Sequence, residues 1–215
     1  MSTLTHRFAP LPTAAVSDAL DALGLPGSLH GIGPLTGTAR AVGPAFTVRY
    51  EPITGEAGTV GDFLDDVPAG AVIVIDNGGR TDCTVWGGIM TTVAAGRRVA
   101  GTVIHGACRD VATAFTLGYP VFSAGRFMRT GKDRVRCVAV QQPVLIDGVT
   151  IAPGDLVTAD ADGVVAVLVA HLDGVAELAE RIEATERRIL EAVSAGRTLI
   201  QARADHGYHA LQSRP

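Results

Sequence analysis

The chain has 215 residues, of which 47% are hydrophobic and 19% are charged, and its formal net charge is −4. This length predicts a single domain, residues 1–215, with enough apolar material for a substantial core. The slight negative charge argues against binding to nucleic acid, because no excess of cations is available to neutralise phosphates. The low share of charged residues suggests that partner subunits cover part of the surface.

The cysteines and the amino-terminal residues indicate the compartment. Cys83, Cys108 and Cys137 form no CxxC pair, which is typical of a reducing environment. The first residues lack the apolar segment of a signal peptide, and no apolar run approaches the ~20 residues of a membrane span. We therefore expect a cytoplasmic protein that binds no membrane.

The first third of the chain contains a helix and a strand. Residues 12–23 are predicted to be helical, because their apolar residues recur at helical spacing and a glycine follows. Residues 38–50 have the composition of a strand, within which Pro44 indicates an edge or a bulge. Residues 60–64 are predicted to form a short helix.

The middle of the chain alternates short apolar runs with helical patterns. The predicted strands are 71–76, 101–104 and 119–123, and the predicted helices are 84–95 and 109–117. Asn77-Gly-Gly79 is predicted to be the turn after the first of these strands. The β-α-β-α-β order implies a parallel sheet with right-handed crossovers.

The last third changes to short strands and then to one long helix. Short strands are predicted at 135–140, 144–147, 149–152, 155–159 and 163–169, and we expect them to form a small antiparallel layer. Asp147-Gly148 is a hairpin turn signal. Residues 172–195 form an amphipathic pattern, and this helix is expected to pack on its own sheet or to reach a neighbouring subunit.

The densest group of reactive residues lies in Val103-Ile-His-Gly-Ala-Cys-Arg-Asp110. A strand is predicted to end at His105, and Arg109 and Asp110 are predicted to open the next helix. Ligands of open α/β sheets bind beyond the carboxyl ends of the strands. A guanidinium there can hold a carboxylate, and a carboxylate can hold Mg²⁺ together with waters. The alternative is that Asp110 favours the helix start and Arg109 pairs with a surface acid.

A glycine-rich stretch from Asp76 to Met90 precedes this group. A glycine-rich turn between a strand and a helix presents free N–H groups, so the amides of Ile89 and Met90 could bind an anion. The alternative is a tight turn with Trp86 in the core.

These two stretches carry a resemblance. The chain resembles the family of 4-hydroxy-4-methyl-2-oxoglutarate aldolases and RraA-like ribonuclease regulators. The resemblance lies in the order Asp-x-Gly-Gly79, Trp86-Gly87 and Gly101-x-Val-Ile-x-Gly-Ala-x-Arg-Asp110, and in residues 154–166. The likeness runs from the first helix to the last. It implies an α/β fold of compact β/β/α, swivelling-domain type, with a mixed sheet and a long carboxyl-terminal helix. It also implies a homotrimer or a dimer of trimers, with that helix (about 172–195) at a subunit interface.

The resemblance also implies an activity. The family's aldolases cleave 4-hydroxy-2-oxo acids to pyruvate and a second oxo acid, and decarboxylate oxaloacetate, with Mg²⁺ or Mn²⁺. By position, Asp110 would be the direct metal ligand, and Glu186 of a neighbouring subunit would support the metal's waters. Arg109 would bind the substrate's carboxylate or enolate oxygen. The other implied substrate-binding residues are Gly87, Gly88, Ile89 and Met90.

The chain departs from the aldolase pattern at three positions. Gly88 and His105 stand where the aldolases usually have acids, and Thr113 stands where an acid is often found. His105 has two interpretations. It could be a structural residue that hydrogen-bonds within its turn. It could instead be a substitute acid/base catalyst, or a metal ligand beside Asp110 that favours Mn²⁺, Co²⁺ or Zn²⁺.

Other residues are weaker candidates. Lys132 lies in a polar turn, which disfavours Schiff-base chemistry. Asp160 and Asp162 could form a metal loop or an ordinary turn between strands. Arg126 and Arg129 could bind a second carboxylate, or they could be ordinary loop charges.

The sequence therefore predicts a divalent-metal-dependent lyase, of aldolase or decarboxylase type, that acts on a small 2-oxo acid through an enolate. Retention of Arg109 and Asp110 favours this function. One alternative is a non-lyase enzyme that uses His105 as acid/base. The other is a non-catalytic RraA-like regulatory protein, which the loss of the acid at position 88 favours. The substrate, the metal, any protein partner and the choice between trimer and hexamer stay open.

Overall fold

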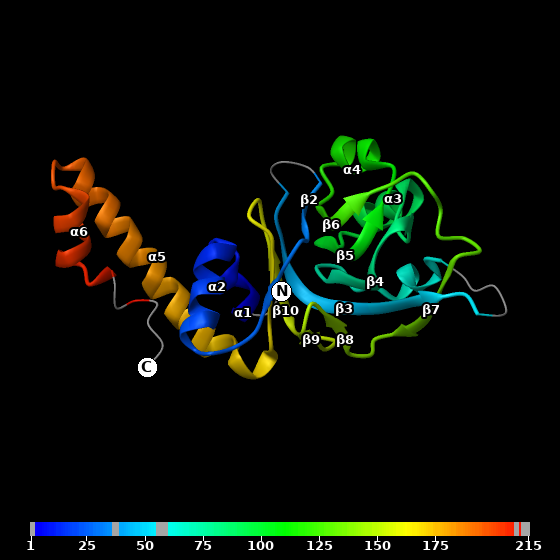
Figure 1. Cartoon of the computed structure of the whole chain (residues 1–215), viewed down its shortest axis with the longest axis horizontal. Coiled ribbons are helices and arrows are strands. Elements are labelled where there is room, and N and C mark those ends of the chain that lie inside the picture. Colours follow the sequence, from blue (N-terminus) through cyan, green and yellow to red (C-terminus); the bar gives the residue numbers. More distant parts are fainter. Residues whose placement is uncertain (1–2, 36–38, 55–59, 209–210, 212–215) are drawn as a thin grey trace.

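The structure is a computed structural model that describes residues 3–35, 39–54, 60–208 and 211 (Figure 1). Its main sheet has nine strands in the order β1-β11-β10-β3-β4-β5-β6-β2, with β7 paired to β3. The strands are β1 Ser28–Leu29, β2 Gly33–Pro34, β3 Ala41–Pro52, β4 Val72–Thr84, β5 Gly101–Cys108, β6 Val121–Arg126, β7 Val135–Val140, β10 Leu156–Ala159 and β11 Val164–Val167. β8 Val144–Ile146 and β9 Val149–Ile151 form a separate hairpin.

The helices flank this sheet on several sides. They are α1 Thr3–Phe8, α2 Thr13–Ala22, α3 Gly88–Gly96, α4 Val111–Leu117, α5 Leu172–Ser194 and α6 Leu199–Asp205, with short 3-10 helices at Asp62–Asp66 and Val169–His171. The predicted α/β class with a mixed sheet and a long carboxyl-terminal helix is therefore confirmed. The predicted helix at 60–64 forms instead as the 3-10 helix that begins two residues later.

The parallel part of the sheet is the predicted one. β3, β4, β5 and β6 are neighbours and run parallel, with α3 and α4 as the crossovers. Apolar residues of β4 alternate between two cores. Ile73 and Ile75 pack with Trp86 under α3 and α4, whereas Val72 and Val74 pack towards the β8–β9 hairpin. Both faces of the parallel strands are buried, which explains their continuous apolar runs.

Several elements differ from the predictions. Pro44 does not mark an edge, because β3 is paired on both sides. The Ala45 N–H donates to the Asp155 carbonyl, 2.7 Å away. Backbone N–H groups of successive strand residues point towards opposite neighbouring strands, so the Pro44 nitrogen points towards β4. The pairing of β3 with β4 begins only at Ala45. The proline therefore removes no ladder hydrogen bond.

The expected turn at Asn77-Gly-Gly79 is a bulge inside a longer strand. β4 continues to Thr84, its register with β5 shifts between Asp76 and Arg80, and α3 begins at Gly88 instead of residue 84. Likewise β5 does not end at His105 but continues to Cys108.

The expected antiparallel layer is also divided differently. Only the β8–β9 hairpin is separate, and its Asp147-Gly148 turn has positive φ at both residues, as predicted. β10 and β11 extend the main sheet beside β3. One helix was not predicted at all: α6 follows α5 and begins with a capping box between Thr198 and Gln201.

The predicted long helix is present as α5, and it spans two environments. Its first half buries Val175, Ala179 and Ile182 against α1, α2 and β11. Its second half leaves the body and packs on α6, so that α5 and α6 form an arm at the opposite end of the molecule from α3 and α4 (Figure 1). In the part of the chain that the structure describes, no helix is long and apolar enough to cross a membrane.

Candidate active site

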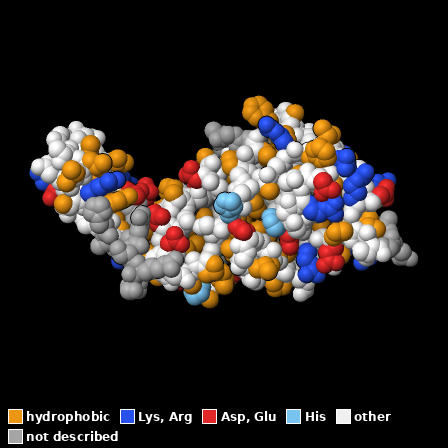
Figure 2. Space-filling view, viewed as in Figure 1, with side chains coloured by type: hydrophobic (Ala, Val, Ile, Leu, Met, Phe, Trp, Pro, Cys, Tyr) orange, Lys and Arg blue, Asp and Glu red, His pale blue; other side chains and the backbone are white. Residues whose placement is uncertain are grey.

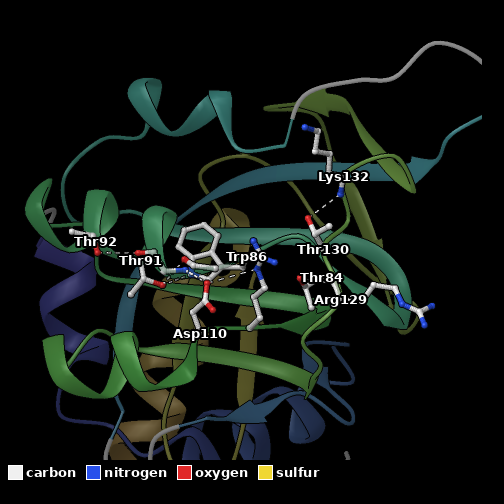
Figure 3. Close-up of polar contacts among 11 residues, drawn as sticks. Thr84, Trp86, Thr91, Thr92, Asp110, Arg129, Thr130 and Lys132 are labelled. Atoms are coloured by element: carbon white, nitrogen blue, oxygen red, sulfur yellow. Dashed lines mark hydrogen bonds and ion pairs between the residues drawn. The ribbon is translucent and has the colours of Figure 1, made fainter.

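Arg109 and Asp110 lie where β5 ends, beside the segment that leads from β4 into α3. The Arg109 N–H donates to the Trp86 carbonyl, 3.0 Å away. The Trp86 indole N–H donates to Thr91 Oγ1 at 2.9 Å, and Thr91 Oγ1 donates to the Gly87 carbonyl at 3.0 Å (Figure 3). These bonds fix the end of β5 and the start of α3 relative to each other.

Asp110 is held in a left-handed backbone conformation, with φ of 57°. Asp tolerates this region better than most residues, because its short polar side chain bonds locally. Its Oδ2 accepts the Gly88 N–H at 2.8 Å, and Arg109 Nε lies 3.7 Å from the same oxygen. Both side chains are about half exposed, at 41% for Arg109 and 49% for Asp110. The pair can therefore be approached by a ligand.

Gly87 and Gly88 leave the space that this pair occupies. A Cβ atom at position 87 would lie 2.9 Å from Asp110 Oδ2 and 3.2 Å from Arg109 Nε, so a side chain there would displace the pair. A Cβ at position 88 would lie 3.2 Å from Thr113 Oγ1 and 3.4 Å from Asp110 Oδ2. The position that carries an acid in the aldolases is thus a notch next to the Asp110 carboxylate.

Ile89 and Met90 occupy the first turn of α3. The first backbone bond of the helix runs from the Thr91 N–H to the Gly87 carbonyl, so the amides of residues 89 and 90 have no partner within the helix. The Ile89 side chain is 84% exposed. The Met90 side chain instead packs towards Gly61, where a Cβ would lie 3.1 Å from its sulfur.

Two hollows flank Asp110. One, of about 330 Å³, is lined by Cys108, Arg109, Asp110, Val111, Arg126, Phe127 and Met128. The other, of about 340 Å³, is lined by Gly88, Ile89, Thr92, Val93 and Thr113. The structure therefore brings together most of the site residues predicted from the sequence, and it adds Arg126 as a close neighbour of Arg109.

His105 lies outside both hollows. Its Nδ1 is 3.0 Å from Asp76 Oδ1, which also accepts the Gly78 N–H at 2.8 Å. A Cβ at Gly79 would stand 3.0 Å from His105 Nε2. The histidine thus makes the local hydrogen bond of the structural interpretation, within the bulge of β4. His105 lies inside β5, which continues to Cys108 beyond its predicted end, and this continuation separates the histidine from Asp110.

Glu186 is not near Asp110 within one chain. It lies on α5, at the end of the molecule away from α3 and α4 (Figure 1). Burial, together with the charges of Asp18 and Glu183, raises the pKa of Glu186. Only another subunit could bring this residue to the site.

The weaker candidates have other roles. Asp160 Oδ1 and Oδ2 accept the Thr13 hydroxyl and N–H at 2.5 and 2.8 Å, so Asp160 caps α2. Burial raises the pKa of Cys108 to about 11, which keeps it a thiol. Arg129 and Lys132 extend away from Asp110 (Figure 3). Among the described residues, no three His, Cys, Asp or Glu side chains are grouped as a metal site.

The comparisons with known proteins identify the class. Residues 13–166 match the family model described as "RraA-like: Aldolase/RraA". That segment is more than half of the chain, and the chain therefore belongs to the RraA-like family.

Individual relatives agree with this assignment. Protein DlpA of Legionella pneumophila is 42% identical over 97% of this chain, but the chain spans only 34% of DlpA. A Halalkalibacterium halodurans protein named "Putative 4-hydroxy-4-methyl-2-oxoglutarate aldolase" is 34% identical, over 91% of this chain and 92% of its own length. The crystal structure of an uncharacterized protein from Pseudomonas syringae pv. tomato has a TM-score of 0.88 and 47% identity, covering 94% of this chain and 96% of that one.

Proposed function

We propose that this chain is a divalent-metal-dependent lyase, of aldolase or decarboxylase type, that acts on a small 2-oxo acid through an enolate. The observation that carries the proposal is the Arg109–Asp110 pair, held against Gly87 and Gly88 and open to ligands. Similarity to the Halalkalibacterium halodurans protein, named "Putative 4-hydroxy-4-methyl-2-oxoglutarate aldolase", supports the same reaction class.

The residues fit a hard divalent cation. Asp110 Oδ2 is oriented by the Gly88 N–H, and the half-exposed carboxylate keeps further lone pairs for a metal. Mg²⁺ is commonly held by one or two carboxylates together with waters and substrate oxygens. The nearby sulfur of Cys108 is a buried thiol, and His105 is paired to Asp76, so oxygen donors dominate the site. A bound Mg²⁺ or Mn²⁺ would supply a Lewis acid for the substrate's 2-oxo group.

The chain's own groups would bind and orient the substrate. In aldol cleavage the C3–C4 bond of a 4-hydroxy-2-oxo acid breaks, and its electron pair stays on C3 as the enolate of pyruvate. The C4 hydroxyl loses its proton and becomes a carbonyl, and C3 then gains a proton. Arg109 would hold the substrate carboxylate and balance the enolate's charge. The free amides of Ile89 and Met90 add N–H donors at the start of α3.

The proton carrier differs from the aldolase pattern. Position 88 has no acid, and the nearest side-chain oxygen to its missing Cβ is Thr113 Oγ1, at 3.2 Å. Since the site is half exposed, we assign the proton transfer to solvent water that reaches this notch.

We also propose that a partner subunit completes the site. Large apolar side chains are exposed on α3 and α4, and others on the α5–α6 arm: Ile89, Val93, Phe115 and Leu117, and Leu190, Val193, Leu199 and Ile200. Figure 2 shows hydrophobic side chains gathered over α4 and at the end of the arm. Two different patches at opposite ends favour head-to-tail contact, and we propose that the rotation between subunits closes this contact into a ring such as a trimer. Such a ring would carry Glu186 towards a neighbour's Asp110.

A second function has one supporting observation. The hydrogen bond between His105 and Asp76 fixes the orientation of the imidazole. In many enzymes a third group orients the general base in the same way. His105 lines neither hollow, so this chemistry would need a substrate bound over the β4 bulge. A non-catalytic regulatory role would not require Arg109 or Asp110. Substitution of either residue therefore distinguishes that role from catalysis.

The test is pyruvate release from 4-hydroxy-4-methyl-2-oxoglutarate and from oxaloacetate, with Mg²⁺, Mn²⁺ or EDTA. Asp110→Asn keeps an acceptor for the Gly88 N–H and tolerates the same backbone, but it lacks the charge that holds a cation. We expect release to be metal-dependent, to fall by at least about 100-fold in Asp110→Asn and by about tenfold in Gly87→Ala. Asp82→Asn, which only breaks a surface pair with Arg80, is the control. Release that is undiminished in EDTA would exclude the proposal.

A further inference from the structure

Arg126 places a second guanidinium in the hollow that holds Arg109. It is the last residue of β6 and is paired in parallel register with Cys108, the last residue of β5. The Phe127 N–H donates to the Cys108 carbonyl at 2.9 Å, which ties the two strand ends together. Residues paired across neighbouring strands point to the same face. This pairing places Arg126 beside the Cys108–Arg109 end of β5, and both arginines line the same hollow.

The charge of this hollow is unbalanced. Its lining has two guanidiniums, Arg109 and Arg126, and one carboxylate, Asp110, which already lies 3.7 Å from Arg109. The Arg126 side chain forms no ion pair or hydrogen bond with any residue that the structure describes. The other arginines around the site are occupied. Arg80 pairs with Asp82 at 2.8 Å, and Arg129 lies over the Phe127 ring, 5.5 Å from its centre.

The rest of the lining suits a short ligand with a charge at each end. Val111, Phe127 and Met128 give the rest of the lining an apolar character. The volume of about 330 Å³ is at the lower end of the roughly 300–1,000 Å³ of small-molecule sites. A small dianion fits these features better than a monoanion or a large cofactor.

We propose that Arg126 is a specificity-determining residue that binds the distal carboxylate of a dicarboxylic 2-oxo acid. The inference rests on the proposed function for its orientation, because that function assigns the substrate's oxo-acid end to Arg109 and Asp110. A planar guanidinium matches a carboxylate with two parallel N–H donors. Arg126 thus discriminates between substrates of equal length that differ in the terminal group.

The test is binding, measured by calorimetry in the presence of Mg²⁺. The two probes are 2-oxoglutarate and 2-oxopentanoate, which have five carbons each and lack the hydroxyl needed for cleavage. We expect the full chain to bind 2-oxoglutarate at least about tenfold more tightly. Arg126→Gln should remove most of this preference while leaving the affinity for 2-oxopentanoate nearly unchanged. Arg129→Gln, whose guanidinium lies over Phe127 outside the hollow, should keep the preference.

Three outcomes would overturn the inference: no preference in the wild-type chain, a preference that survives Arg126→Gln, or no binding of either probe. The failure of the proposed function is a separate result. If 2-oxoglutarate binds in an Arg126-dependent way but no metal-dependent pyruvate release is found, Arg126 is confirmed as a carboxylate-binding residue of a protein that is not this lyase.

Discussion

Single residues determine both the site and part of the stability of this chain. Gly87 matters for the side chain that it lacks, because Arg109 and Asp110 occupy that space. Asp160, which the sequence presented as a metal-loop candidate, accepts hydrogen bonds from Thr13 and from the Asp162 N–H. Thr13 begins α2, and no side chain of the preceding Pro12 can cap the helix. Asp160 therefore supplies an N-cap from a distant turn.

This cap predicts a pH-dependent stability. Burial alone would raise the pKa of Asp160, but the hydrogen bonds from Thr13 and Asp162 and the charge of Arg40 outweigh it, so the pKa is lowered from 3.8. A carboxyl group with a depressed pKa stabilises the fold above its unfolded pKa, and this contribution is lost as the pH falls through the folded pKa. Asp160→Asn should therefore lower the free energy of unfolding by about 1–2 kcal/mol at pH 7.

Urea denaturation at several pH values measures this effect. The difference between wild type and Asp160→Asn should shrink as the pH falls below 3.8. Asp162→Asn changes an acid of the same turn whose side chain does not cap α2, and it serves as the matched control. A difference that is the same at pH 7 and pH 3 would contradict the assignment.

At the scale of elements, the sequence predicted what periodicity encodes. β7 has the predicted bounds 135–140, α5 differs by one residue from 172–195, and the β-α-β order was correct. Errors arose where tertiary pairing overrides local signals. Asn77-Gly-Gly79 has the composition of a turn, but pairing with β5 resumes at Arg80 and makes it a bulge. Pro44 is typical of an edge strand, but its nitrogen points away from the β3–β10 ladder, so it fits inside the sheet.

Other elements could have been read from the sequence. The Thr198-Leu-Ile-Gln201 capping box marks the start of α6. The candidate site was predictable because Arg109 and Asp110 follow a buried strand, whereas the isolation of His105 from them was not. Its separation depends on the continuation of β5 to Cys108, and neither Gly106 nor Ala107 carries a signal for that. For Arg126 the sequence left two interpretations open, a carboxylate-binding residue or an ordinary loop charge, because sequence spacing cannot show that β6 ends beside β5.

At the scale of the whole molecule, the α5–α6 arm and the α3–α4 face are both apolar surfaces that could pack against each other. Each exposes large apolar side chains, and neither is covered within the described chain. The proposed ring would bury both surfaces, and the hydrophobic effect would favour it by about 25 cal/mol for each Å² of apolar surface removed from water.

The proposed ring makes a prediction about mass in solution. Ile200 on α6 is 82% exposed and Phe115 on α4 is 74% exposed. Ile200→Asp and Phe115→Asp should each lower the molar mass measured by light scattering from that of an oligomer towards that of one chain, because a buried unpaired charge is costly. Leu145→Asp changes a side chain that is 61% exposed on the β8–β9 hairpin, and it should leave the mass unchanged. A wild-type chain that is monomeric at tens of micromolar would contradict the ring.

The central claim is that Arg109 and Asp110 stabilise an enolate with a divalent cation, and proton exchange tests it without a cleavable substrate. The measurement is the loss of the pyruvate methyl signal in D₂O, followed by proton NMR with Mg²⁺, Mn²⁺ or EDTA. The account predicts metal-dependent exchange by the wild-type chain that falls by at least about 100-fold in Asp110→Asn and in Arg109→Gln. Absence of exchange with either metal, or equal exchange in the Asp110→Asn variant, would contradict it.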